Sequence, residues 1–277
     1  MPLCPVRECE AGFSSADLPF LQRIQVAGSD DVWDEWGLSK TLGPQKTVEV
    51  LEQHHKDFIQ ESDFDELAAY GINSIRVPLP YWALIPTQGN EPYQNASQLD
   101  RLSDVMQWCY KRQMNVIVDL HSMPGSQSGD QASGHNTSNP TFWTDANQAR
   151  SVQTVQALIN WIGQHPYKSV VSGVCPVNEP RAQVGFSAND PDKLATLRSY
   201  YAKTYSLLSK AGLPMIFHPS FYVGNALDYW ADFVTGKDPN VSSPAALTYQ
   251  LAEEYLTDDY ICIPSHSSSS TLCTLTL

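Results

Sequence analysis

The sequence predicts an α/β fold of the (β/α)8-barrel class, with about four clear strand-helix units. Helical segments and short strands alternate from about residue 46 to 234, an order that indicates a parallel sheet covered by helices. The 277 residues, 42% of them apolar, suit one barrel-type domain. An apolar run over 170–177 also ends in Asn178-Glu179-Pro180, and the carboxyl ends of barrel strands form the active face.

The first two units lie between residues 62 and 120. A capped start and a glycine stop predict a short helix over 62–71, followed by a strand over 72–78. After Ser97, apolar residues at spacings of three and four predict a second helix, formed by Leu99, Leu102, Met106 and Cys109. The apolar run over 116–120 is the next predicted strand.

Two more units follow. Helical spacing from Val152 to Ile162 ends at Gly163 and Pro166, before the strand that begins near residue 170. Asp190, followed by Pro191, predicts the start of a helix that reaches Gly212. Residues 215–217 then read as a strand.

The spacing of these units predicts an incomplete barrel. The four strands begin near residues 73, 115, 170 and 214, so eight units would need roughly 375 residues at that spacing. We therefore expect an unassigned segment at 1–31, a partial glycosidase-type domain at 32–240 and an irregular or disordered tail at 241–277. The expectation is a chain truncated at both ends.

Composition excludes several classes of partner. Seventeen lysines and arginines against 30 aspartates and glutamates give a net charge of −13, which repels nucleic acid and anionic lipid. No apolar run is long enough to span a membrane, and no signal peptide is visible. Three glycosylation sequons, at Asn95, Asn136 and Asn240, would matter only in a secreted protein.

The sequence contains no motif that is typical of a metal or cofactor site. The six cysteines form no CxxC pair, and HExxH, P-loop and GxGxxG patterns are missing. We expect no metal and no cofactor, and we expect Cys109 and Cys175 to be buried free thiols.

Three polar residues at strand positions are the candidates for chemistry. Arg76 lies inside an apolar strand and needs an acceptor nearby, in a structural ion pair or in a site. His121 follows a strand directly. That position favours a hydrogen-bonded wall residue over a general base, because no acid partner is visible in the sequence. Glu179 is either a structural acid or a catalytic one, and partial desolvation of its carboxyl would favour the proton-donor role.

Several segments together resemble one family, the fungal exo-β-1,3-glucanases of glycoside hydrolase family 5. The similarity covers about residues 32 to 240, with Phe221 and Trp230 in a stretch similar to the family's fifth unit. The segments are Val32-Trp33-Asp34-Glu35-Trp36-Gly37-Leu38, Gly71-Ile72-Asn73-Ser74-Ile75-Arg76-Val77-Pro78, Tyr81-Trp82, Asp119-Leu120-His121, Pro124-Gly125-Ser126-Gln127 and Val177-Asn178-Glu179-Pro180.

The resemblance implies a (β/α)8 barrel that hydrolyses β-glucan with retention. Glu179 matches the family's acid/base and Asn178 the neighbour that binds the sugar 2-hydroxyl. Arg76 matches the arginine that holds the nucleophile, and His121 the histidine lining the innermost sugar subsite. It also implies a monomer, located outside the cell or in the cell wall, with a β-glucan polysaccharide or oligosaccharide as partner.

The chain departs from the family's pattern at its nucleophile, which therefore stays unknown. Because double displacement needs a second carboxylate, we expect this chain to be an incomplete and inactive form of such an enzyme. The family's late Gly-Glu-aromatic motif is missing after Pro180, and Glu253 and Glu254 sit in a segment typical of an exposed helix. Asp130 also stands where the family commonly has a sugar-clamping phenylalanine. Two alternatives remain open: a non-catalytic β-glucan-binding protein, and a related endo-glucanase or β-1,6-glucanase.

Overall fold

The computed structural model describes residues 32, 34–185, 187–235, 237 and 272–274. Its main sheet contains the strands β1 (Ser74–Pro80), β2 (Asn115–Ser122), β3 (Val171–Cys175) and β6 (Leu272–Thr274). Their order is β3-β2-β1-β6, and every pair is parallel. Met215 extends the sheet by a parallel bridge to Val174. The carboxyl ends of β1, β2 and β3 therefore open on one edge.

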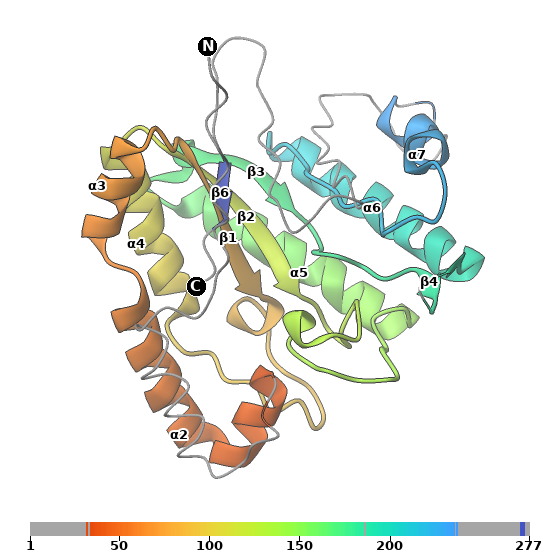
Figure 1. Cartoon of the computed structure of the whole chain (residues 1–277), viewed down its shortest axis with the longest axis horizontal. Helices are drawn as coiled ribbons and strands as arrows, with labels where there is room; N and C mark the ends of the chain where they lie inside the picture. The colour runs from red at the N-terminus through yellow and green to blue at the C-terminus, as the bar shows by residue number, and fades with distance from the viewer. Residues whose placement is uncertain (1–31, 33, 186, 236, 238–271, 275–277) are drawn as a thin grey trace.

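Helices alternate with these strands, as the sequence predicts. Figure 1 shows them arranged around the sheet, with α2 extending away from it. They are α2 (Glu35–Phe58), α3 (Glu61–Ala69), α4 (Gln98–Lys111), α5 (Asp145–Gln164), α6 (Pro191–Lys210) and α7 (Ala226–Val234). Short 3-10 turns lie at η1 (Tyr81–Ala83), η2 (Gln131–Ser133) and η3 (Lys168–Val170), and a small hairpin joins β4 (Gln183–Val184) to β5 (Ala188–Asn189).

Local sequence signals explain most of these boundaries. Asp190 caps α6 by accepting hydrogen bonds from the backbone N–H groups of Asp192 and Lys193, which confirms the predicted start. The predicted strand at 215–217 forms only the single bridge at Met215. The sequence did not predict α2, which is two helical segments that meet at Gly43, where φ is 72°.

Alternation along β1 and β2 separates the core from the site. Ile75, Val77 and Leu79 of β1 are fully or almost fully buried, as are Val116, Val118 and Leu120 of β2. They join the apolar side chains of α4, α5 and α6 in one cluster. Because successive strand residues face opposite sides, Arg76, Asp119 and His121 share the other face of the sheet.

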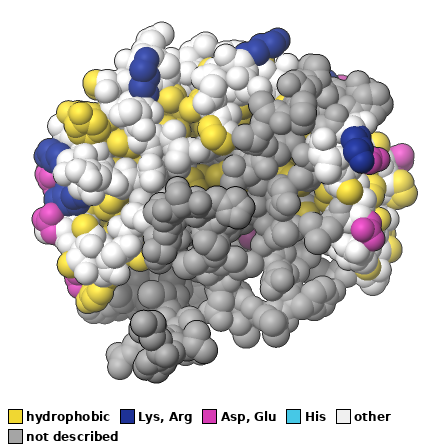
Figure 2. All heavy atoms as spheres, turned by 90° about the horizontal axis from the view of Figure 1, so that it is seen from above, with side chains coloured by type: hydrophobic (Ala, Val, Ile, Leu, Met, Phe, Trp, Pro, Cys, Tyr) yellow, Lys and Arg dark blue, Asp and Glu magenta, His cyan; other side chains and the backbone are white. Residues whose placement is uncertain are grey.

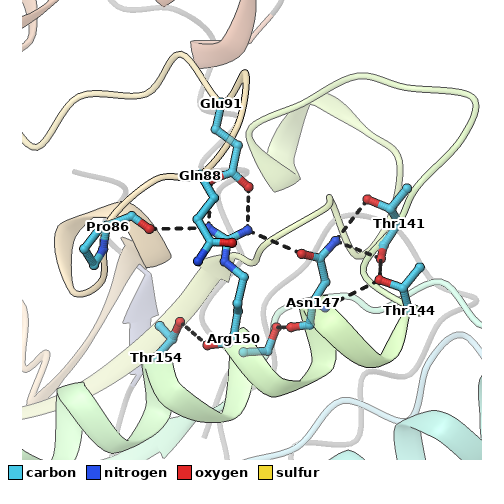
Figure 3. Close-up of polar contacts among 9 residues, drawn as sticks. Pro86, Gln88, Glu91, Thr141, Thr144, Asn147, Arg150 and Thr154 are labelled. Carbon is cyan, nitrogen blue, oxygen red and sulfur yellow. Dashed lines mark hydrogen bonds and ion pairs between the residues drawn. The ribbon is translucent and has the colours of Figure 1, made fainter.

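A buried ion pair holds the segment after η1 against α5. Figure 3 shows Arg150 pointing from α5 to Glu91, with nitrogen–oxygen distances of 2.6 and 2.8 Å. Arg150 also donates to the carbonyl of Pro86 at 3.4 Å and lies over the ring of Tyr81. The side chains of Arg150 and Glu91 are only 10% and 13% exposed. Their ion pair therefore fixes the connection from β1 to α4.

Some sequence expectations fall outside the described residues. These are the 1–31 segment and, in the tail, everything but Leu272–Thr274, which forms β6 rather than irregular chain. Cys109 and Cys175 are buried and free, as predicted. Among the described helices, none combines the length and apolar character needed to cross a membrane. On the face shown in Figure 2, lysine and arginine side chains lie apart from one another.

Candidate active site

The neighbouring strands β1 and β2 bring an arginine and an aspartate together. Arg76 Nη2 lies 2.9 Å from Asp119 Oδ2, and their side chains are 12% and 0% exposed. This confirms that Arg76 has the acceptor that its buried position requires. Burial lowers the pKa of Arg76, but the charge of Asp119, and further on that of Glu179, outweigh it and raise the pKa above its ordinary value.

The same aspartate holds His121. The Nδ1 of His121 lies 2.6 Å from Asp119 Oδ2, so this histidine has an acid partner that the sequence analysis did not identify. Burial raises the pKa of Asp119, but the Arg76 guanidinium and then the His121 hydrogen bond hold it below its usual value. Asp119 is therefore a carboxylate that orients both neighbours.

Asn178 closes the network from the segment after β3. Its Oδ1 accepts a 2.6 Å hydrogen bond from Arg76 Nη2, and its Nδ2 lies 3.4 Å from His121 Nε2. These partners assign the proton of a neutral His121 to Nδ1, facing Asp119, with Nε2 as the acceptor. Asn178 is 5% exposed, so three of the four predicted residues meet at one place.

Glu179 is the fourth predicted residue and stands next to this network. Its backbone is left-handed, with φ of 44°, and its side chain is exposed. The partial desolvation expected for this carboxyl is therefore not found in the described structure.

The loop after His121 forms a rim beside Glu179. Arg181 makes an ion pair with Asp130 across that rim, including a 3.2 Å contact from Nη1 to Oδ1. Asp130, where the resemblance led us to expect an aromatic clamp, thus places charge and hydrogen-bonding groups at the entrance.

His218 is a neighbour of the site that the sequence analysis missed. It follows the bridge residue Met215 by three positions, and its Nδ1 accepts a 3.0 Å hydrogen bond from the backbone N–H of Ser220. Burial, together with the charge of Arg76, lowers its pKa to about 4, so it is neutral at physiological pH. The signal was available, because His218 ends a predicted strand as His121 does.

The arrangement places several hydrogen-bonding side chains beside one exposed carboxyl group. Within the described residues, no group of three or more histidine, cysteine or acidic side chains could hold a metal ion. A fixed arginine, asparagine and histidine beside an exposed carboxyl can bind hydroxyl groups and transfer a proton. The only glutamates after Pro180, Glu253 and Glu254, lie outside the described residues.

Comparison with known proteins identifies relatives of this arrangement. A family model described as Cellulase (glycosyl hydrolase family 5) matches residues 39–188. Probable glucan 1,3-beta-glucosidase A of Aspergillus fumigatus is 31% identical over 230 residues, which are 82% of this chain and 51% of that protein. Glucan 1,3-beta-glucosidase of Pichia angusta is 32% identical over 223 residues, 79% of this chain and 48% of that protein.

The solved structures show the same relationship in three dimensions. The rutinosidase from Aspergillus niger matches with a TM-score of 0.68 and 25% identity, over 79% of this chain and 62% of that one. The chain spans about half the length of the curated relatives that it matches.

Proposed function

Since this chain belongs to glycosyl hydrolase family 5, we propose that it hydrolyses the glycosidic bonds of β-glucans, with Glu179 as the acid/base. The family and the barrel class that the sequence motifs predicted are confirmed. The described residues form part of such a barrel, and we propose that residues 32–240 are one glycosidase domain. Asn178, Arg76 and His121 are the proposed sugar-binding residues.

The observation that carries this proposal is the network around Asp119. It joins Arg76 of β1, His121 near the carboxyl end of β2, and Asn178 in the segment that follows β3 and leads directly to Glu179. Barrel enzymes assemble their reacting groups at this edge. Because both partners of Asp119 are bound to it, their side chains need little reorganisation when a sugar arrives.

In the proposed reaction, Glu179 protonates the departing glycosidic oxygen and later removes a proton from the attacking water. Its exposed position beyond β3 lets a polysaccharide reach it. Retention needs a second carboxylate about 5 to 5.5 Å away, which the described residues do not assign. The proposal therefore includes a nucleophile outside the described part of the structure.

A second candidate is a non-catalytic β-glucan-binding protein, favoured by the unassigned nucleophile. Both candidates predict binding of laminari-oligosaccharides, but only the first predicts turnover. We also propose a monomer that acts outside the cell or in the cell wall; in support, the sequon asparagines Asn95 and Asn136 are exposed.

One experiment tests these alternatives. The purified chain is incubated with laminari-oligosaccharides, cellulose and pustulan, and the anomer released is followed by proton NMR. The proposal predicts hydrolysis of the β-1,3 substrate, release of the β-anomer and loss of turnover in Glu179→Gln. Binding without turnover would favour the binding protein, and preference for cellulose or pustulan would favour an endo-glucanase or a β-1,6-glucanase.

A further inference from the structure

Gln127 is a buried polar residue to which the proposed mechanism assigns no role. It lies in the loop between β2 and η2, and it is 1% exposed. Its Nε2 donates hydrogen bonds to the carbonyls of His121 at 2.7 Å and of Asn178 at 2.8 Å. Its Oε1 accepts from the backbone N–H of Met123 at 3.0 Å. Both amide protons and the amide oxygen are therefore used.

The backbone of Gln127 makes a fourth contact, and this one lies on the other side of Glu179. The carbonyl of Gln127 accepts a 3.2 Å hydrogen bond from the N–H of Arg181. The segment Asn178-Glu179-Pro180-Arg181 is thus bound at both ends to one residue. Between those ends, Glu179 has a φ of 44°, a conformation that a non-glycine residue keeps only where its surroundings impose it.

A second clamp holds the same segment from the opposite side. Ser220, fully buried, donates from Oγ to the carbonyl of Pro180 at 2.7 Å and accepts from the N–H of Ala182 at 3.1 Å. The Ser220 contacts begin only after Glu179. Of Gln127 and Ser220, only Gln127 binds the carbonyl of Asn178. That carbonyl belongs to the peptide bond that joins Asn178 to Glu179.

We propose that Gln127 is a positioning residue, which imposes the left-handed backbone at Glu179 and so directs its carboxyl group into the site. The catalytic part of this inference rests on the proposed function. Gln127 fits the task because its amide matches two carbonyls and one N–H at once. A glutamate lacks the two donors, an asparagine is one carbon shorter, and a methionine fills the space without either group.

The test is amide hydrogen exchange in the full chain, resolved to Asn178, Arg181 and Ala182. In Gln127→Met, exchange at Asn178 and Arg181 should rise about tenfold or more, because the side-chain hydrogen bonds to the carbonyls of Asn178 and His121 are lost. The matched control is Gln148→Met. Gln148 is also buried and donates to a backbone carbonyl, that of Phe142, at 2.8 Å, but its loss should leave those amides unchanged.

Kinetic measurements then distinguish a positioning role of Gln127 from a purely structural role. With laminari-oligosaccharides, Gln127→Met should lower kcat about tenfold or more while KM changes less than about twofold, because Gln127 aligns the proton donor without binding sugar. Gln127→Glu keeps the shape and can donate one hydrogen bond when protonated. It should recover part of the exchange protection at mildly acidic pH and lose it at alkaline pH.

The outcomes are distinguishable. Unchanged exchange at Asn178 and Arg181 in Gln127→Met, or an equal rise in Gln148→Met, overturns the inference, as does faster exchange with an unaltered kcat. If the unaltered chain shows no turnover, the proposed function fails, and the exchange results still decide whether Gln127 holds the backbone of Glu179. If Gln127→Met does not fold, Gln127→Glu supplies the same comparison through its dependence on pH.

Discussion

Arg76 and Asn178, 102 residues apart in the sequence, are joined by a 2.6 Å hydrogen bond from Nη2 to Oδ1. The same nitrogen lies 2.9 Å from Asp119 Oδ2. One guanidinium therefore connects β1, β2 and the segment after β3 at the edge where the site lies. Its loss should affect both the stability of the sheet and the placement of the sugar-binding groups.

Replacing Arg76 should be costly, since Asp119 would remain as a buried carboxylate without its cation. We expect Arg76→Met to lower the free energy of unfolding by about 3–5 kcal/mol at neutral pH, measured by urea denaturation. The control is Lys111→Met, which removes an ion pair to Glu61 at the surface and should cost far less. Similar losses in the two variants would contradict a central role for Arg76.

Glu35 should make the protein less stable as the pH rises. Burial raises the pKa of its carboxyl from 4.5 to about 8, so the native state favours the protonated form. This stabilisation is complete below pH 4.5 and is lost as the pH rises from 4.5 to about 8. The free energy of unfolding should fall by up to about 5 kcal/mol over that window.

The variant Glu35→Gln isolates this effect, because its neutral amide does not titrate. Urea unfolding at several pH values should give a flatter pH dependence for the variant than for the unaltered chain. Parallel curves for the two proteins would show that the carboxyl of Glu35 ionises as easily in the folded as in the unfolded chain.

Glu91, in contrast, should make the protein less stable as the pH falls into the acidic range. Burial raises its pKa, but the hydrogen bonds from Arg150 outweigh it and hold the pKa below 4.5. Because the folded pKa is the lower one, the stabilisation is present above pH 4.5 and is lost as the pH falls through the folded value. Glu91→Gln should therefore destabilise the chain by about 1–3 kcal/mol at neutral pH, and less in acid.

Thermal unfolding of the Glu91→Gln protein at neutral and acidic pH checks this, with Glu61→Gln as the exposed counterpart. A penalty for Glu91→Gln that stays constant down to strongly acidic pH would mean that the contact with Arg150 shown in Figure 3 does not stabilise the fold through its charge.

The sequence predicted the strands and helices that position the site, because their apolar spacing and caps are local signals. It did not predict α2, whose two segments meet at Gly43 and Pro44, a pair that normally interrupts a helix. It also found no partner for His121, although Asp119 lies two residues earlier and two strand residues at that spacing share a face. The shared ion pair with Arg76 depends on the register between β1 and β2, which no local pattern specifies.

Glu179 shows most clearly which features could not be predicted from the sequence. Its place after a strand was predictable, whereas its left-handed backbone lies between two residues that are bound by Gln127 and Ser220 from distant segments. His218 was overlooked although it follows a predicted strand. The hydrogen bond that fixes its ring comes from the backbone N–H of Ser220, whose φ is 69°. No local sequence signal predicts this left-handed conformation.

In the proposed reaction, Glu179 donates the proton that cleaves a β-1,3-glucosidic bond. The most direct measurement is the rate of laminari-oligosaccharide hydrolysis by the unaltered chain, by Glu179→Gln and by Glu52→Gln, an exposed glutamate on α2. We predict turnover for the unaltered chain and for Glu52→Gln. For Glu179→Gln we predict an intact fold and a hydrolysis rate lower by about 100-fold or more. Equal rates for Glu179→Gln and the unaltered chain would show that Glu179 is not the proton donor.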